Sequence, residues 1–135
     1  MTVLTLPFPI SVNAMFADGK TRRFKSQRYA DWIAEAGYAL KSQRPKSVPG
    51  PVTLLYEVQE GKDARRRDLG NLEKGVTDLL VDHGVIEADH DRIVREIRLI
   101  WNKDVVGVRV SVASASISTA GEENDRDRTQ QQPAA

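Results

Sequence analysis

The sequence of 135 residues contains no cysteine and only two histidines. The absence of cysteine excludes a disulfide framework, a thiolate metal site and a catalytic thiol. Zinc sites use three or four nitrogen or sulfur ligands, and His83 and His90 do not provide such a set. We expect His83 to serve a helix C-terminus and His90 to lie in a loop. Metal-dependent chemistry would therefore depend on oxygen ligands.

Long apolar runs are also missing. No stretch approaches the roughly 18 apolar residues of a membrane span, and no basic-then-apolar leader is present. We therefore expect a soluble cytoplasmic protein without a membrane partner. The length suits one domain with a hydrophobic core. We expect this domain to comprise residues 1–113, and residues 114–135, which are polar and lack periodicity, to form a disordered tail.

The net charge is only +1, but the charges are unevenly distributed. Residues 1–67 contain twelve Lys and Arg against six Asp and Glu, whereas residues 68–96 contain three against eight. A basic segment beside an acidic one is what a metal-dependent nuclease needs, because cations bind phosphates and carboxylates bind metal ions. A surface asymmetry without function would give the same counts, so this signal alone does not decide.

The apolar periodicity predicts the order β-α-β-α-β-β, which indicates a small single-domain α/β fold with a mixed sheet packed by two helices. The expected strands are residues 3–6, 52–58, 93–101 and 105–112, and the expected helices are residues 26–44 and about 69–83. We expect the last two strands to be antiparallel neighbours joined by a short hairpin at residues 102–104. The expected core-facing residues of the first helix are Ala30, Ile33, Ala34, Gly37, Tyr38 and Leu40, with Trp32 near the edge.

We expect the polar residues 11–25 to form a loop, in which Asp18-Gly19 favours a hairpin turn. Its candidate DNA-binding cations are Lys20, Arg22 and Arg23. They are flanked by Phe16 and Phe24. Aromatic side chains among arginines can stack on bases or wedge between them, although packing a loop against the core is the commoner use.

Three consecutive arginines, Arg65, Arg66 and Arg67, lead directly into Asp68. Apolar residues recur at helical spacing from Leu72 onward, so a helix is predicted to begin near residue 69 or 70. Asp68 then lies at its N-terminus, where unpaired backbone N–H groups and the helix dipole favour an anion. The structural alternative is that Asp68 is an ordinary N-cap and the arginines belong to a solvated loop.

Lys74 shares the polar face of this helix with Asn71 and Asp78. Its amine can reach back toward the start of the helix, or it can form an ordinary i,i+4 pair with Asp78. Clustered cations, a fixed carboxylate and a reachable lysine suit a phosphodiester held beside a metal ion. Asp68 with Asp89 or Asp91 would suit Mg²⁺, which proteins hold by few carboxylates plus substrate phosphate.

These segments resemble the RusA-type Holliday junction resolvases. The features that carry the resemblance stand in the family's order and spacing over residues 3–112. They are Leu6-Pro7-Phe8-Pro9 with Ser11 and Asn13, then Arg66-Arg67-Asp68-Leu69-Gly70-Asn71-Leu72-Glu73-Lys74 with Asp78, Leu79 and Leu80, then Gly84-Val85-Ile86-Glu87-Ala88-Asp89.

The resemblance implies a homodimeric, Mg²⁺-dependent endonuclease, with Mn²⁺ as a possible substitute. It would bind branched, four-way DNA junctions and nick two strands symmetrically during recombination and repair, in a bacterial or phage-infected cell. The implied catalytic residues are Asp68, Lys74 and Asp89, and the implied metal ligands are Asp68, Asp89 and Asp91. The implied DNA-binding residues are Arg65, Arg66, Arg67, Asn71, Asn13, Lys20, Arg22 and Arg23.

Two positions depart from the family's pattern. Gly70 stands where a second aspartate is usual, and Ala88-Asp89-His90-Asp91 replaces two adjacent aspartates. Asp89 is the second metal ligand if the alignment runs without a gap from Gly84, and Asp91 is if one residue is inserted; we prefer Asp89. Because Gly70 removes an expected carboxylate, the alternative function is a catalytically weakened junction-binding protein. A third alternative is a nuclease for other branched or flapped DNA.

Overall fold

The structure, a computed structural model, describes residues 1–19 and 22–115. The predictions for Lys20 and for residues 116–135 of the tail fall outside this part. The strands are β1 (Thr2–Leu6), β2 (Phe16–Asp18), β3 (Arg23–Lys25), β4 (Val52–Gln59), β5 (Val94–Asn102) and β6 (Val108–Ser114). The helices are α1 (Gln27–Ser42) and α2 (Lys74–Asp82), with the 3₁₀ turns η1 (Val12–Ala14) and η2 (Leu69–Leu72).

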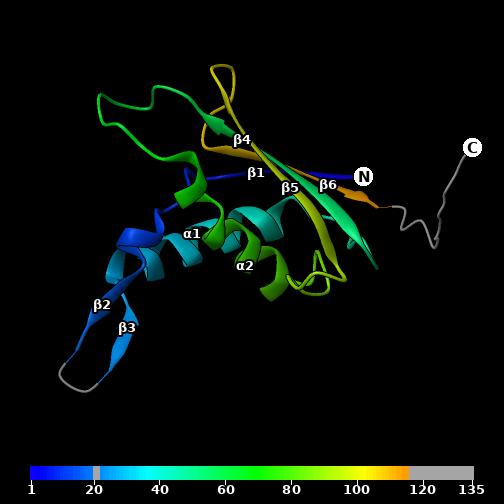
Figure 1. The fold of residues 1–135 in the computed structure, drawn as a ribbon, viewed down its shortest axis with the longest axis horizontal. Helices are drawn as coiled ribbons and strands as arrows, with labels where there is room; N and C mark the ends of the chain where they lie inside the picture. The colour runs from blue at the N-terminus through cyan, green and yellow to red at the C-terminus, as the bar shows by residue number, and fades with distance from the viewer. Residues whose placement is uncertain (20–21, 116–135) are drawn as a thin grey trace, which may run out of the picture.

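A mixed four-stranded sheet in the order β1-β6-β4-β5 forms one layer, and α1 and α2 form the other (Figure 1). The predicted α/β class and element order are confirmed, with the hairpin β2–β3 added at the expected Asp18-Gly19 turn. Within the described residues, no helix has the length and apolar character needed to cross a membrane. The strand β6 ends at Ser114, and the Ala115 N–H donates to the Pro51 carbonyl at 2.8 Å, so pairing extends slightly beyond residue 113.

The predicted pairing of the last two strands is wrong, because β4 lies between β5 and β6. The strand β4 is parallel to β5 and antiparallel to β6. The strand β6 lies between β1 and β4, and its Val108, Val110 and Val112 are all fully buried. The side chains of β5 are mostly exposed, and this strand takes the edge.

The buried face of α1 also differs from the predicted one. Its buried residues are Tyr29, Trp32, Ala36, Gly37 and Leu40. Of the predicted stripe, Gly37 and Leu40 are buried and Ile33 is partly buried, whereas Ala30, Ala34 and Tyr38 are exposed. The two aromatic side chains bury more area than alanines can and so determine the rotation of the helix. The Trp32 indole N–H donates to the Phe8 carbonyl at 2.9 Å, which fixes α1 against the segment after β1.

The helix predicted to begin near residue 69 starts as the 3₁₀ turn η2 and becomes α-helical at Lys74. It ends as predicted: the His83 N–H donates to the Leu79 carbonyl, and Gly84 takes a positive φ of 70°. Four predicted core residues are buried beneath it, namely Leu72, Val76, Leu79 and Leu80.

A buried polar contact joins α2 to the sheet. The hydroxyls of Tyr56 in β4 and Thr77 in α2 share a hydrogen bond of 2.7 Å, and the Thr77 hydroxyl also contacts the Glu73 carboxylate. Burial raises the pKa of Tyr56 well above its ordinary value, so the phenol stays protonated. The contact therefore fixes the first turn of α2, where the predicted site begins, against the sheet.

We expect Tyr56→Phe to lower the free energy of unfolding by about 1 kcal/mol, because one buried hydrogen bond is lost while Thr77 keeps its contact with Glu73. Urea unfolding followed by circular dichroism measures the change. The matched control is Tyr38→Phe, because Tyr38 is 77% exposed on α1 and should leave stability unchanged. Equal stability of both variants would show that the Tyr56 contact adds nothing net.

Candidate nucleic-acid and metal site

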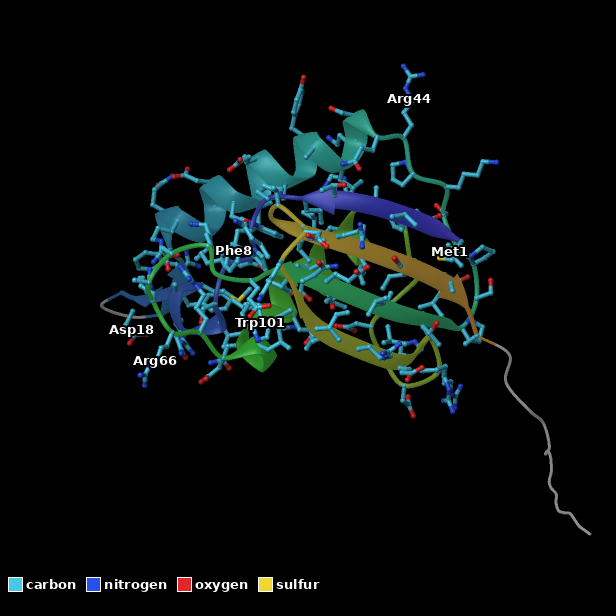
Figure 2. All side chains as sticks on the ribbon, turned by 90° about the horizontal axis from the view of Figure 1, so that it is seen from above. Met1, Phe8, Asp18, Arg44, Arg66 and Trp101 are labelled. Carbon is cyan, nitrogen blue, oxygen red and sulfur yellow. The ribbon has the colours of Figure 1, made fainter. Side chains whose placement is uncertain are left out.

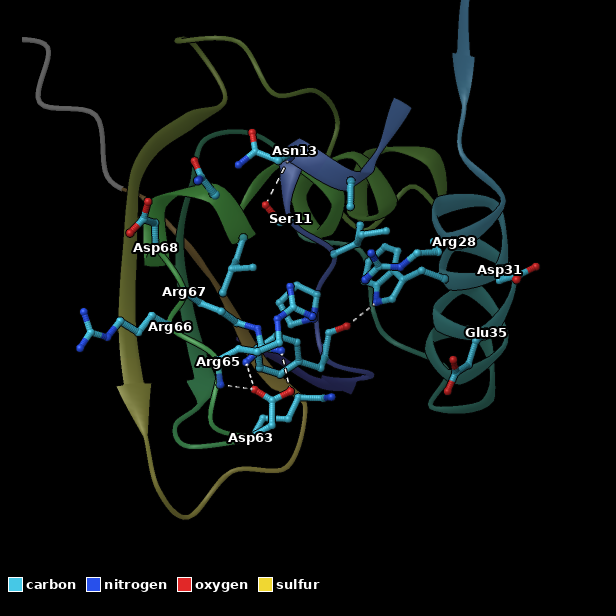
Figure 3. A pocket seen from close by; sticks show the side chains of 18 residues that line it. Ser11, Asn13, Arg28, Asp31, Glu35, Asp63, Arg65, Arg66, Arg67 and Asp68 are labelled. Atoms are coloured by element: carbon cyan, nitrogen blue, oxygen red, sulfur yellow. Dashed lines mark hydrogen bonds and ion pairs between the residues drawn. The ribbon is translucent and has the colours of Figure 1, made fainter. Parts of the chain in front are cut away.

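Two cavities lie on either side of the segment 62–68, which connects β4 to η2. The first cavity, of about 640 Å³, lies between this segment, η1 and α1 (Figure 3). The second cavity, of about 420 Å³, lies between the same segment, the end of β4 and Trp101 of β5. Six of the predicted site residues line the first cavity: Asn13, Arg65, Arg66, Arg67, Asp68 and Asn71. Across the first cavity, α1 contributes Arg28, Asp31 and Glu35.

The arginine segment is held in place by Asp63. Two guanidinium nitrogens of Arg67 donate to the two oxygens of Asp63 at 2.7 and 2.9 Å, and the Arg65 backbone N–H donates to the same carboxylate at 2.9 Å. These bonds, above all those from Arg67, hold the pKa of Asp63 well below its ordinary value. The Arg67 guanidinium also lies 5.0 Å from the ring centre of Phe8.

Sequence reasoning missed the role of Asp63. The signal was present in its spacing of four residues from Arg67, but the chain there is a loop and not a helix, so the pattern indicated no contact. From the sequence, Phe8 was named only as part of the motif Leu6-Pro7-Phe8-Pro9, and no contact was predicted for it. In the structure its ring receives two cations, Arg67 and Lys62, the latter at 5.4 Å from the ring centre.

The three arginines are therefore not equivalent. The Arg67 side chain is largely covered and is committed to Asp63 and Phe8. The side chains of Arg65 and Arg66 are exposed, and within the described part of the chain they make no hydrogen bond or ion pair. Figure 3 shows Arg66 extending away from the body of the protein. The cations available to an external anion here are Arg65 and Arg66.

Asp68 occupies the N-cap position of η2, as predicted, but it does not act as a side-chain cap. Its backbone is extended, and its carboxylate forms no capping hydrogen bond. The Asn71 N–H instead bonds to the Asp68 backbone carbonyl at 3.0 Å. An exposed carboxylate without a capping role, on the wall of both cavities, is available to bind a cation.

The position of the missing aspartate is open. A Cβ placed on Gly70 would meet no atom within 4 Å, so the neighbouring structure does not require glycine. Gly70 belongs to η2, two residues after Asp68. An aspartate side chain would therefore fit at this position.

Lys74 forms the ordinary helical pair that was the structural alternative. Its Nζ lies 3.2 Å from an Asp78 oxygen, one turn further along α2, and does not reach back to the helix start. The hydrogen bond to Asp78 and the charge of that carboxylate raise the pKa of Lys74, and the charge of Asp89 adds to the rise. The backbone carbonyl of Asp91 accepts a hydrogen bond from the Arg95 guanidinium at 2.7 Å.

The structure does not assemble the whole predicted metal set in one place. In residues 1–19 and 22–115 there is no group of three or more His, Cys, Asp or Glu side chains arranged to hold a metal ion. Asp68 lines both cavities, whereas Lys74, Asp89 and Asp91 line neither. Oxygen ligands of the kind that Mg²⁺ prefers are present, and Mg²⁺ is commonly held by one or two carboxylates completed by substrate phosphate and water. The donor set fits such a partial site.

The predicted loop cations Arg22 and Arg23 lie on the hairpin β2–β3, which projects from the rest of the molecule (Figure 1). Arg23 covers the ring of Phe16 at 5.3 Å, and Phe16 packs edge-on against Tyr29, with ring centres 6.0 Å apart. Phe16 thus anchors the hairpin on α1. Phe24 is 50% exposed. These side chains do not line the two cavities.

A comparison with protein families matches the model of the endodeoxyribonuclease RusA to residues 7–113. The chain belongs to the RusA family of endodeoxyribonucleases. The matched residues include every residue that lines the two cavities. No curated protein matches the chain significantly.

In this RusA-family chain we expect Arg67→Ala to loosen the segment 60–68, because the pair with Asp63 and the contact with Phe8 are both lost. Amide hydrogen exchange of that segment should become faster, while exchange in β6 stays unchanged. The control is Arg66→Ala, which removes the neighbouring exposed cation and should leave exchange as in the wild type. Faster exchange in both variants would show that total charge, and not the Asp63 pair, orders the segment.

Proposed function

We propose that the chain is a metal-dependent endonuclease that resolves four-way DNA junctions by paired symmetric nicks, acting as a homodimer during recombination and repair. It would act in the cytoplasm of a bacterial or phage-infected cell. The observation that carries the proposal is Asp68: its exposed carboxylate forms no capping bond and lines two cavities together with Arg65 and Arg66. Membership of an endodeoxyribonuclease family supports the reaction class.

Different side chains would have different roles in binding DNA. Arg65 and Arg66 bind backbone phosphates, because exposed unpaired guanidinium groups pair well with phosphate oxygens. Arg67 acts indirectly, by holding its two neighbours in place through Asp63. Asn13 and Asn71 contribute amide groups to the wall of the first cavity. Arg22 and Arg23 of the hairpin would contact a more distant part of the DNA, and Lys20 remains a predicted DNA contact.

Asp68 would hold a Mg²⁺ or Mn²⁺ ion, with Asp89 as the preferred second ligand and Asp91 as the other candidate. When bound, the ion would polarise the scissile phosphate and activate a water molecule. Lys74 would offset the charge that develops on the phosphate. The negative charge of Asp89 contributes to the raised pKa of Lys74, which supports Asp89 as the preferred ligand.

The test of this function separates chemistry from binding. We expect Asp68→Asn to abolish cleavage of a synthetic four-way junction with Mg²⁺ or Mn²⁺ and to keep binding within about twofold, because the phosphate-binding arginines are untouched. Arg66→Ala should instead weaken binding. It should also flatten the slope of log affinity against log salt concentration by about 0.9, the value for one neutralised phosphate. The same assays with a linear duplex measure the preference for branched DNA.

Equal loss of binding and cleavage in Asp68→Asn would show that Asp68 is structural. An unchanged salt slope in Arg66→Ala would place that side chain away from the DNA backbone.

A second candidate function, a junction-binding protein with weakened catalysis, is favoured by the open space at Gly70 and by the absence of a three-carboxylate group in residues 1–19 and 22–115. We expect Gly70→Asp to increase the cleavage rate and to lower the Mg²⁺ concentration needed for half-maximal rate. The added charge lies in the first turn after Asp68, where the backbone N–H groups favour an anion, so stability should not fall.

Gly70→Asn is the matched control, because it fills the same space without the charge and should leave the Mg²⁺ dependence unchanged. If the wild type is fully active and Gly70→Asp is slower, another carboxylate already completes the site. If neither form cleaves branched DNA while both bind it, the binding function is the correct one.

A further inference from the structure

The second cavity contains an aromatic side chain that the proposed chemistry does not use. Trp101 is the penultimate residue of β5 and is 36% exposed. It shares the lining of the cavity with Arg65, Arg66 and Asp68. Figure 2 shows Trp101, Phe8 and Arg66 together at the end of the molecule opposite Met1.

Trp101 is not a buried core residue. Trp101 pairs in register with Val58, which is fully buried, but it sits on the edge strand, where one flank of the sheet has no further strand within the described residues. The chain has one other tryptophan, Trp32, which is 7% exposed and donates its indole N–H to the Phe8 carbonyl. In the described structure the Trp101 indole donates no hydrogen bond.

The ring of Trp101 is also free of cations, although it lies among them. Lys62 and Arg67 both line the second cavity, yet both lie over Phe8. In the described part of the chain, no cation and no second aromatic ring lies over Trp101. Trp101 lines the second cavity and is 36% exposed, so part of its side chain is open to a flat partner from outside the protein.

We propose that Trp101 is a stacking platform for a nucleobase that has left the duplex stack at a DNA branch point. The inference rests on the proposed function and specifies how its site selects a substrate. Asp68 and Arg66 line both cavities, so a phosphate bound on the segment between them has the second cavity directly beside it. The base of an adjoining nucleotide then reaches Trp101.

Stacking on an aromatic side chain is tolerant of sequence, because every base has a π-face. A continuous duplex keeps its bases paired and stacked, and drawing one out costs unpairing and unstacking energy. That cost is smallest at a branch point, where stacking is already interrupted. The second cavity therefore favours branched over continuous DNA, whereas Arg65 and Arg66 bind the backbone of both.

Intrinsic fluorescence tests the proposal directly, since Trp101 is the more exposed of only two tryptophans. The full chain carrying Asp68→Asn, which should leave the DNA intact, is titrated with a four-way junction and with a linear duplex. DNA occupancy is measured separately by anisotropy of a labelled strand. We expect the junction to quench the emission and the duplex, at equal occupancy, to quench it much less. Trp101→Phe in the same background should abolish the difference.

Affinity provides a second readout. We expect Trp101→Ala to weaken junction binding about tenfold, which is within the range measured for loss of one stacked base, and to weaken duplex binding less than twofold. Trp101→Phe should restore most of the junction affinity. The matched control is Ile100→Ala, because Ile100 is 37% exposed on the adjacent residue of β5 but points to the other face of the sheet and lines neither cavity.

Equal quenching by junction and duplex, or equal weakening of both by Trp101→Ala, would overturn the proposal. This result is distinguishable from failure of the proposed function. If the wild type cleaves junctions and Asp68→Asn does not, the nuclease site stands whatever Trp101 does. If Asp68→Asn still cleaves, the nuclease site is misplaced, and the same titration without divalent metal ions then reports whether a base reaches Trp101.

Discussion

The bidentate pair between Arg67 and Asp63 is the interaction on which the site depends. It closes the loop after β4 and, through the cation over Phe8, attaches that loop to the segment after β1. Because Arg67 keeps the pKa of Asp63 low, the contribution of this pair is present above the ordinary pKa of an aspartate and is lost only as pH falls through the lowered value. The pair is therefore intact at neutral pH, where it positions the neighbouring Arg66 and Asp68.

The consecutive arginines 65–67 thus differ in what their side chains do. Arg67 satisfies its charge inside the protein, and the exposed Arg66 has no partner in residues 1–19 and 22–115. The pair with Asp63 links Arg67 to the start of the loop, while the side chains of Arg65 and Arg66 are exposed. Asp68 follows in the same loop with its carboxylate free of capping bonds. A loop held by an internal ion pair beside exposed charge would suit the phosphate and metal site proposed above.

Local patterns predicted the local structure. The alternation from Val52 to Val58 predicted β4, and the spacing from Leu72 predicted the buried face of α2, since both depend on which side chains avoid water. The order of the strands in the sheet was not predictable in this way, because the alternation of apolar and polar residues within a strand does not show which strands pair with it. Lys74 shows the same limit at the site: the sequence allowed it either to reach back toward the helix start or to pair with Asp78, and the structure shows the pair. Asp63 was missed altogether, because its partner Arg67 lies four residues away in a loop.

The position of β5 at the sheet edge has a consequence for self-association. A strand with a free edge offers unpaired backbone groups to other chains, and an aromatic side chain beside it would make such pairing more favourable. Along this strand Arg95, Glu96 and Arg98 are all exposed. Charged side chains at an open edge oppose intermolecular strand addition. They therefore counteract the tendency to aggregate that the partly exposed Trp101 beside this edge would otherwise increase.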